Sequence, residues 1–175
     1  MSIAFEHLME TSRVLVEIDQ EPIAQTIEIL RKAKKDGNQV FLFGNGGSHS
    51  NASHFANDLL KACGIKAICI SDMIPTILAY NNDDGKDFMF QLPFSYLKND
   101  GDIIFGISCS GESGNVKEMF FNGRHEKILL TGESITSNSA HLANVVIPVP
   151  HPNIRIQESC HSAICHAIVE ALLSE

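Results

Sequence analysis

Two ionisable side chains stand four residues apart in the stretch GNGGSHSNASHFAND, residues 44–58: His54 and Asp58. On a helix this spacing places both side chains on one face, where an imidazole and a carboxylate can share a metal ion. An ordinary solvated helix face can carry the same pair. The pair therefore indicates a metal or acid–base site only if further ligands come from elsewhere in the chain.

A second pair of histidines, His161 and His166, lies near the end of the sequence in an otherwise apolar stretch. A buried imidazole needs a polar partner, so each histidine is either a metal ligand or a core residue bonded to a backbone carbonyl. We predict the core role for His161, whereas for His166 the residues by themselves leave both roles open.

Two loops rich in glycine and serine could bind an anion. They are GNGGS at residues 44–48 and SCSGESGN at residues 108–115. Glycine lets the backbone approach an anion, helix N-termini present free amides, and serine hydroxyls donate without adding charge. Ordinary turns would use the same residues. Neither loop has a Walker ending or the GxGxxG spacing, which favours a small phosphorylated ligand over a nucleotide.

These segments must be positioned by the strands and helices around them. Two helices are predicted before the first strand, near residues 3–18 and from Pro22 up to Gly37, and a last helix over about residues 158–173. Short apolar runs without alternation predict buried parallel strands at residues 40–43, 67–70, 103–107, 128–130 and 145–147. The prediction is an α/β, three-layer fold, a parallel five-stranded sheet flanked by helices. Both loops follow strands, at the sheet edge where such folds bind ligands.

The composition limits the classes of function. A chain of 175 residues with 44% hydrophobic content fits one compact domain. The formal charge of −8 argues against a nucleic-acid partner. No apolar run is long enough to span a membrane and no apolar leader opens the sequence, so we expect no membrane partner and a cytoplasmic location. The five cysteines have no CxxC spacing, so neither disulfides nor a zinc ribbon are predicted.

The order of these motifs resembles the SIS (sugar isomerase) domain, and within it the phosphoheptose isomerase family. The motifs are GNGGS followed by SHFAND, SxSGxSGN after the third strand, LTG at residues 130–132, and the paired histidines. The resemblance implies one SIS domain over residues 1–175 with flavodoxin-like topology, in which residues 1–36 serve oligomerisation and residues 37–175 form the α/β core. It further implies a homotetramer with sites at subunit interfaces and conversion of sedoheptulose 7-phosphate to D-glycero-D-manno-heptose 7-phosphate.

The resemblance also implies roles for single residues. One zinc ion per subunit would be held by His54, Asp58, His166 and one residue from the start of the last helix, although these ligands also suit Fe²⁺, Mn²⁺ or Co²⁺. Asp58 would act as the catalytic base at carbon and His166 as the proton shuttle at oxygen. The substrate- and phosphate-binding set would be Asn45, Gly46, Gly47, Ser48, Asn82, Asp83, Ser108, Ser110, Ser113 and Thr131.

Three positions depart from the family pattern. Gln157, in the family's RIQE motif, lies nine residues before His166 instead of eight, about half a helical turn out of phase, so we assign the fourth metal ligand to Glu158 with Gln157 as the alternative. Asp58 stands where the isomerases carry Glu and is shorter by about 1.5 Å, and Glu112 stands where the heptose enzymes usually have Asn. An isomerase for a different phosphosugar, or a non-catalytic phosphosugar sensor or replication-initiation regulator, therefore remains an alternative.

Overall fold

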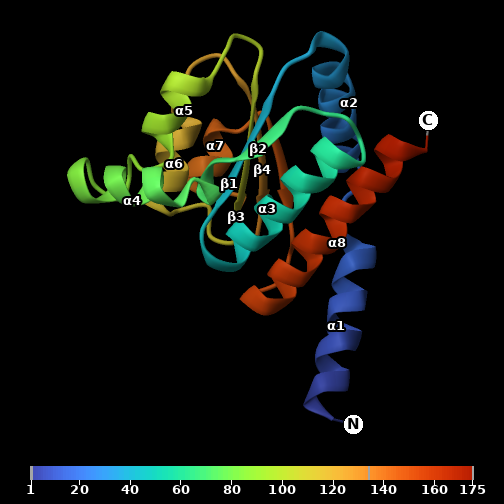
Figure 1. Ribbon diagram of the computed structural model, residues 1–175. Coiled ribbons are helices and arrows are strands. Elements are labelled where there is room, and N and C mark those ends of the chain that lie inside the picture. Colours follow the sequence, from blue (N-terminus) through green and yellow to red (C-terminus); the bar gives the residue numbers. More distant parts are fainter. Residues whose placement is uncertain (1, 134, 175) are drawn as a thin grey trace.

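A parallel five-stranded sheet lies between two layers of helices (Figure 1) in a computed structural model that describes residues 2–133 and 135–174. Neighbouring strands are parallel throughout, in the order β2-β1-β3-β4-β5. This is the flavodoxin-like order, with its switch point between β1 and β3. The predicted fold class is confirmed. The strands are β1 (Val40–Gly44), β2 (Ala67–Cys69), β3 (Ile103–Ser108), β4 (Glu126–Thr131) and β5 (Val145–Pro148).

The helices are divided between the two faces of the sheet. One face is covered by α2 (Glu21–Asp36), α3 (Gly46–Lys61) and α8 (Ile154–Leu173), with α1 (Ile3–Glu17) packed against α8. The other face carries α4 (Ile74–Asp83), α5 (Gln91–Leu97), α6 (Gly114–Phe120) and α7 (Asn138–Leu142), and a short 3-10 turn, η1 (Ile70–Asp72), follows β2. None of the described helices combines the length and the apolar character needed to cross a bilayer.

Each strand contributes side chains to two separate cores. In β1, Val40 and Leu42 pack under α2, α3 and α8, whereas Phe41 and Phe43 pack under α4 to α6. Because successive side chains of a strand point to opposite faces, a strand covered on both sides must be apolar throughout. This explains the runs without alternation in the sequence and gives the loops at the carboxyl ends of the strands a rigid support.

The last helix begins earlier than predicted, which is a correction to the sequence analysis. It starts at Ile154 because the Asn153 side chain accepts a hydrogen bond from the Arg155 amide at 3.0 Å and caps the helix. Gln157 and Glu158 therefore sit within the first turns of α8, with their orientation fixed by the helix.

Candidate active site

The two glycine- and serine-rich loops meet at the carboxyl edge of the sheet, as expected from the topology. They enclose a pocket of about 280 Å³ together with the start of α8. Among the residues that the structure describes, no Lys, Arg or His lines this pocket, so an anion there would be held by hydroxyls and backbone amides. Five residues of the predicted phosphate-binding set line this pocket: Asn45, Ser48, Ser108, Ser110 and Ser113.

A pair of side-chain amides fastens the two loops to each other. Asn45 Nδ2 donates to Asn115 Oδ1 at 3.0 Å, and Asn115 Nδ2 donates to Asn45 Oδ1 at 2.9 Å. Asn115 is buried and was not among the predicted site residues. Its position at the end of the SGESGN sequence was the only signal available, since a reciprocal amide pair depends on both loops being placed.

Thr131 supports the pocket from behind. It is fully buried, and its Oγ1 donates to the Ser108 carbonyl oxygen at 2.8 Å. Gly46, with a φ of 54°, and Gly47 also lie outside the lining. A side chain at Gly47 would collide with the carboxylate of Glu158, so that carboxylate would have to move away from its present place beside the loop. These residues shape the pocket without facing it.

His54, Asp58 and His166 form a compact triad between α3 and α8. One ligand atom from each lies within 4.8 Å of the others. Asp58 Oδ2 is 3.4 Å from His54 Nε2 and 3.9 Å from His166 Nε2, and the two imidazole rings are 5.0 Å apart. The His54 and His166 side chains are 57% and 53% exposed. Helical packing thus brings together three predicted ligands from segments far apart in the sequence.

The SIS domain family model matches residues 5–130 of this chain. Phosphoheptose isomerases from Hamiltonella defensa subsp. Acyrthosiphon pisum and Salmonella paratyphi B are 36% and 35% identical to it, covering 85% and 87% of this chain and 76% and 83% of theirs. The chain belongs to the phosphoheptose isomerase family. The structure of phosphoheptose isomerase GmhA from Neisseria gonorrhoeae superposes with a TM-score of 0.90 at 28% identity, covering 98% of this chain and 97% of the other.

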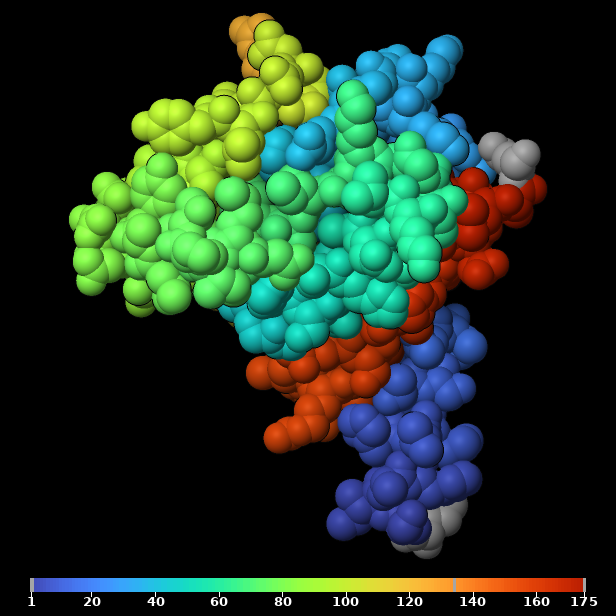
Figure 2. All heavy atoms as spheres, in the orientation of Figure 1, coloured from blue at the N-terminus to red at the C-terminus, as the bar shows by residue number. Residues whose placement is uncertain are grey.

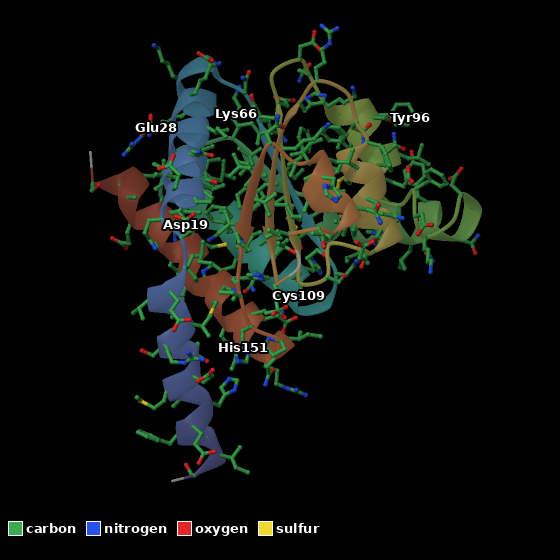
Figure 3. All side chains as sticks on the ribbon, turned by 180° about the vertical axis from the view of Figure 1, so that it is seen from behind. Asp19, Glu28, Lys66, Tyr96, Cys109 and His151 are labelled. Carbon is green, nitrogen blue, oxygen red and sulfur yellow. The ribbon has the colours of Figure 1, made fainter. Side chains whose placement is uncertain are left out.

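The fourth metal ligand that the sequence predicts, Glu158, does not lie beside the triad of the same chain. Glu158 lines the serine pocket and is no part of the triad, and the eight residues that separate it from His166 span about 12 Å of helix. Gln157 points inward, where its Nε2 donates to the His151 carbonyl and its Oε1 has no partner among the described residues. In Figure 3, Cys109 and His151 mark this end of the sheet.

Two other members of the predicted substrate set lie away from the pocket. Asn82 and Asp83 are exposed at the end of α4, with Asn82 Nδ2 donating to Asp83 Oδ1 at 2.6 Å, and neither lines the pocket. Cys109 does line it, a residue that the sequence analysis had assigned no role. Burial, with a smaller effect of the Glu158 charge, raises the pKa of the Cys109 thiol, so it acts as a neutral wall of the pocket.

His161 is the core histidine that the sequence predicted. It is fully buried, and its Nε2 lies 2.9 Å from the Thr131 carbonyl oxygen. Burial lowers the pKa of His161 to about 4, so the imidazole is neutral at physiological pH. His161 therefore holds the end of β4 in place, and its predicted core role is confirmed.

Proposed function

We propose that this protein is an aldose–ketose isomerase that converts sedoheptulose 7-phosphate to D-glycero-D-manno-heptose 7-phosphate. The observation that carries the proposal is the presence, in a chain of the phosphoheptose isomerase family, of both a serine-lined pocket and a His54–Asp58–His166 triad. The pocket suits a phosphate and the triad suits proton transfer beside a metal. Neither an SIS-domain sensor nor a regulator needs the second feature.

The phosphate group would bind to the serine pocket. Ser48, at the start of α3, and Ser110 and Ser113, before α6, bring hydroxyls to the pocket, and their loops place backbone amides beside them. Such donors bind a phosphate through hydrogen bonds to charged oxygens, which are stronger than hydrogen bonds between neutral groups. The loops are already fastened by the Asn45–Asn115 pair, so little ordering is required on binding.

The triad fits a zinc ion. Two imidazoles and one carboxylate are a common three-ligand set of catalytic zinc, which keeps a further position open. An ion held by His54, Asp58 and His166 would polarise the carbonyl group of the sugar. The carboxylate oxygens also suit Fe²⁺, Mn²⁺ and Co²⁺, so zinc is proposed on its family resemblance and ligand set together.

Asp58 and His166 would carry the protons. Isomerisation removes a proton from the carbon beside the carbonyl, returns it to the neighbouring carbon and moves a second proton between the two oxygens. The Asp58 carboxylate, 23% exposed and close to both imidazoles, would act as the base at carbon. His166, on the opposing helix, would act as the shuttle at oxygen.

A homotetramer with sites between subunits is part of the proposal. Figure 2 shows α1 extending away from the body of the molecule. Its apolar side chains are largely uncovered, among them Ile3 at 86% exposed and Val16 at 82%. An apolar helix of this kind needs a covering surface, and a second copy supplies one for residues 1–36. Association would also shield the exposed triad from water and allow Glu158 of one subunit to approach the triad of another.

One departure from the family pattern lies outside the pocket. The Glu112 carboxylate accepts hydrogen bonds from the Asn138 amide at 2.9 Å and from Asn138 Nδ2 at 2.7 Å, at the start of α7. These bonds lower the pKa of Glu112 and keep it ionised. Glu112 thus joins two loops outside the pocket lining, whereas the departure at Asp58 lies in the triad itself and bears on the choice of sugar. An isomerase for another phosphosugar is the second candidate on that account.

Ser110→Ala should raise KM about tenfold or more with a smaller change in kcat, because one hydrogen bond to the phosphate is lost in both the ground state and the transition state. Steady-state kinetics with sedoheptulose 7-phosphate measure this. Ser95→Ala is the matched control, since Ser95 lies on α5 and its hydroxyl donates to the Leu92 carbonyl. An unchanged KM in Ser110→Ala would show that the pocket does not hold the phosphate.

The function as a whole is tested by metal analysis of the purified protein and by assay of sedoheptulose 7-phosphate isomerisation with and without a chelator. We expect stoichiometric metal, turnover, and loss of turnover on chelation that added Zn²⁺ restores. Metal without turnover of this sugar would favour the second candidate, an isomerase for another phosphosugar. Binding of phosphosugars without metal and without turnover would favour a sensor.

A further inference from the structure

A second cluster of metal-binding side chains lies outside the triad. His49 belongs to the first turns of α3, Cys69 is the last residue of β2, and Asp72 ends the 3-10 turn η1. One ligand atom from each lies within 4.8 Å of the others, and His49 Nε2 is 2.6 Å from Asp72 Oδ1. None of the three lines the serine pocket.

We propose that His49, Cys69 and Asp72 form a second divalent metal site, of zinc type, separate from the His54–Asp58–His166 triad. Thiolate, imidazole and carboxylate are the three ligand classes that zinc accepts in proteins. The thiolate sets this site apart, because sulfur ligands favour zinc and related soft ions over Mg²⁺ or Ca²⁺. Asp72 is 49% exposed at the side chain, which leaves room for water as a further ligand.

The side chains around the cluster hold its ligands in place. Ser53 Oγ donates to Asp72 Oδ2 at 2.8 Å, which fixes the carboxylate and directs Oδ1 toward His49. Ser71, inside η1, accepts from the Gly44 amide at 3.1 Å and donates to the Gly44 carbonyl at 3.0 Å. The turn that carries Asp72 is thereby tied to the end of β1. Outer hydrogen bonds of this kind are what orient the ligands of protein metal sites.

Cys69 packs in the core that α2, α3 and α8 cover, and its thiol lies at the edge of that core beside His49 and Asp72. Its side chain is 3% exposed at an edge strand of the sheet, and burial, reinforced by the Asp72 charge, raises its pKa to about 12. A thiol with a raised pKa is mostly protonated near neutral pH and is a weak nucleophile. Metal binding is compatible with it, because a dication replaces the thiol proton.

A metal at this site would act on the pocket from outside. His49 follows Ser48 directly in the sequence, and Ser48 lines the phosphate pocket. Bonding His49 to the end of β2 and to η1 would therefore immobilise the first turn of α3, on which the Ser48 hydroxyl depends. The ion would be structural, with its effect on stability and on KM and not on the chemical step.

Cobalt substitution tests the proposal on the full-length protein. The metal-free chain is titrated with Co²⁺, and the near-ultraviolet absorption of a thiolate–cobalt bond is followed together with the bound metal. We expect about two equivalents of Co²⁺ per chain and the thiolate band. Cys69→Ser and Asp72→Asn should each retain only about one equivalent, and Cys69→Ser should lose the band. His54→Ala should also lose about one equivalent but keep the band.

Cys165→Ser is the control, because Cys165 lies beside the triad and could supply a thiolate there. It should leave both the band and the metal content unchanged. The proposal is overturned if the unaltered chain binds only about one equivalent with no band, or if the band survives Cys69→Ser and disappears in Cys165→Ser. Asp72→Asn is the second variant because Asp72 is exposed, whereas Cys69 is buried and its replacement can disturb folding. A melting curve of Asp72→Asn with the native transition shows that its loss of metal is local to the site.

Discussion

Asp58→Asn is expected to lower kcat by a factor on the order of 1000 or more, with the fold intact. The substitution keeps the size of the side chain and removes the only carboxylate of the triad, so that no group of the triad remains to take the proton from carbon. Steady-state kinetics on sedoheptulose 7-phosphate measure the loss, and circular dichroism checks the fold. Full activity in Asp58→Asn would remove the residue from the mechanism.

Two further variants sharpen this test. Asn57→Ala is the neighbouring control: Asn57 Nδ2 donates to Asp58 Oδ1 at 3.2 Å but lies outside the triad, so the variant should keep most of its activity. Asp58→Glu restores the carboxylate that the family carries, with about 1.5 Å more reach. It should retain measurable turnover, whereas Asp58→Asn should not. Equal losses in both would show that geometry, and not the carboxylate itself, limits the rate.

His166→Ala is expected to lower kcat by a similar factor, on the order of 1000, while changing the melting temperature little. The His166 side chain is 53% exposed at the surface of α8, so its removal leaves no buried cavity, but it removes the proposed proton shuttle at oxygen. Kinetics and thermal melting on the same sample separate the two effects. A variant that melts normally and turns over at the native rate would contradict the assignment.

His161→Gln is the matched control on the same helix. His161 is fully buried and bonded to the Thr131 carbonyl, so its loss should lower the melting temperature and affect kcat far less than His166→Ala does. Its pKa is about 4 in the fold and near 6.5 otherwise, so the unfolded chain binds a proton between these values that the folded chain refuses. This residue therefore costs stability as the pH falls from about 6.5 toward about 4, and the glutamine variant should lose less stability over that range.

The fold was predictable because its determinants are local. A strand buried on both faces must be apolar throughout, which made Val40 to Phe43 recognisable, and Gly37 ends α2 with the positive φ of 76° that favours glycine. The predicted start of α8 followed the apolar periodicity, whereas the actual start is marked by a capping asparagine. Asn153 placed the start four residues before the predicted one.

The sequence by itself determined the parallel sheet, the two serine loops at one of its edges, and the i, i+4 spacing of His54 and Asp58, because each depends on periodicity or on strand direction. Only the tertiary structure decided that His166 completes the triad, that Glu158 faces the serine pocket, and that His49 meets Cys69 and Asp72. Periodicity fixes which face of a helix a side chain occupies. Which distant face it meets is set by how α3 packs against α8 and against the end of β2, and that is a property of the whole core.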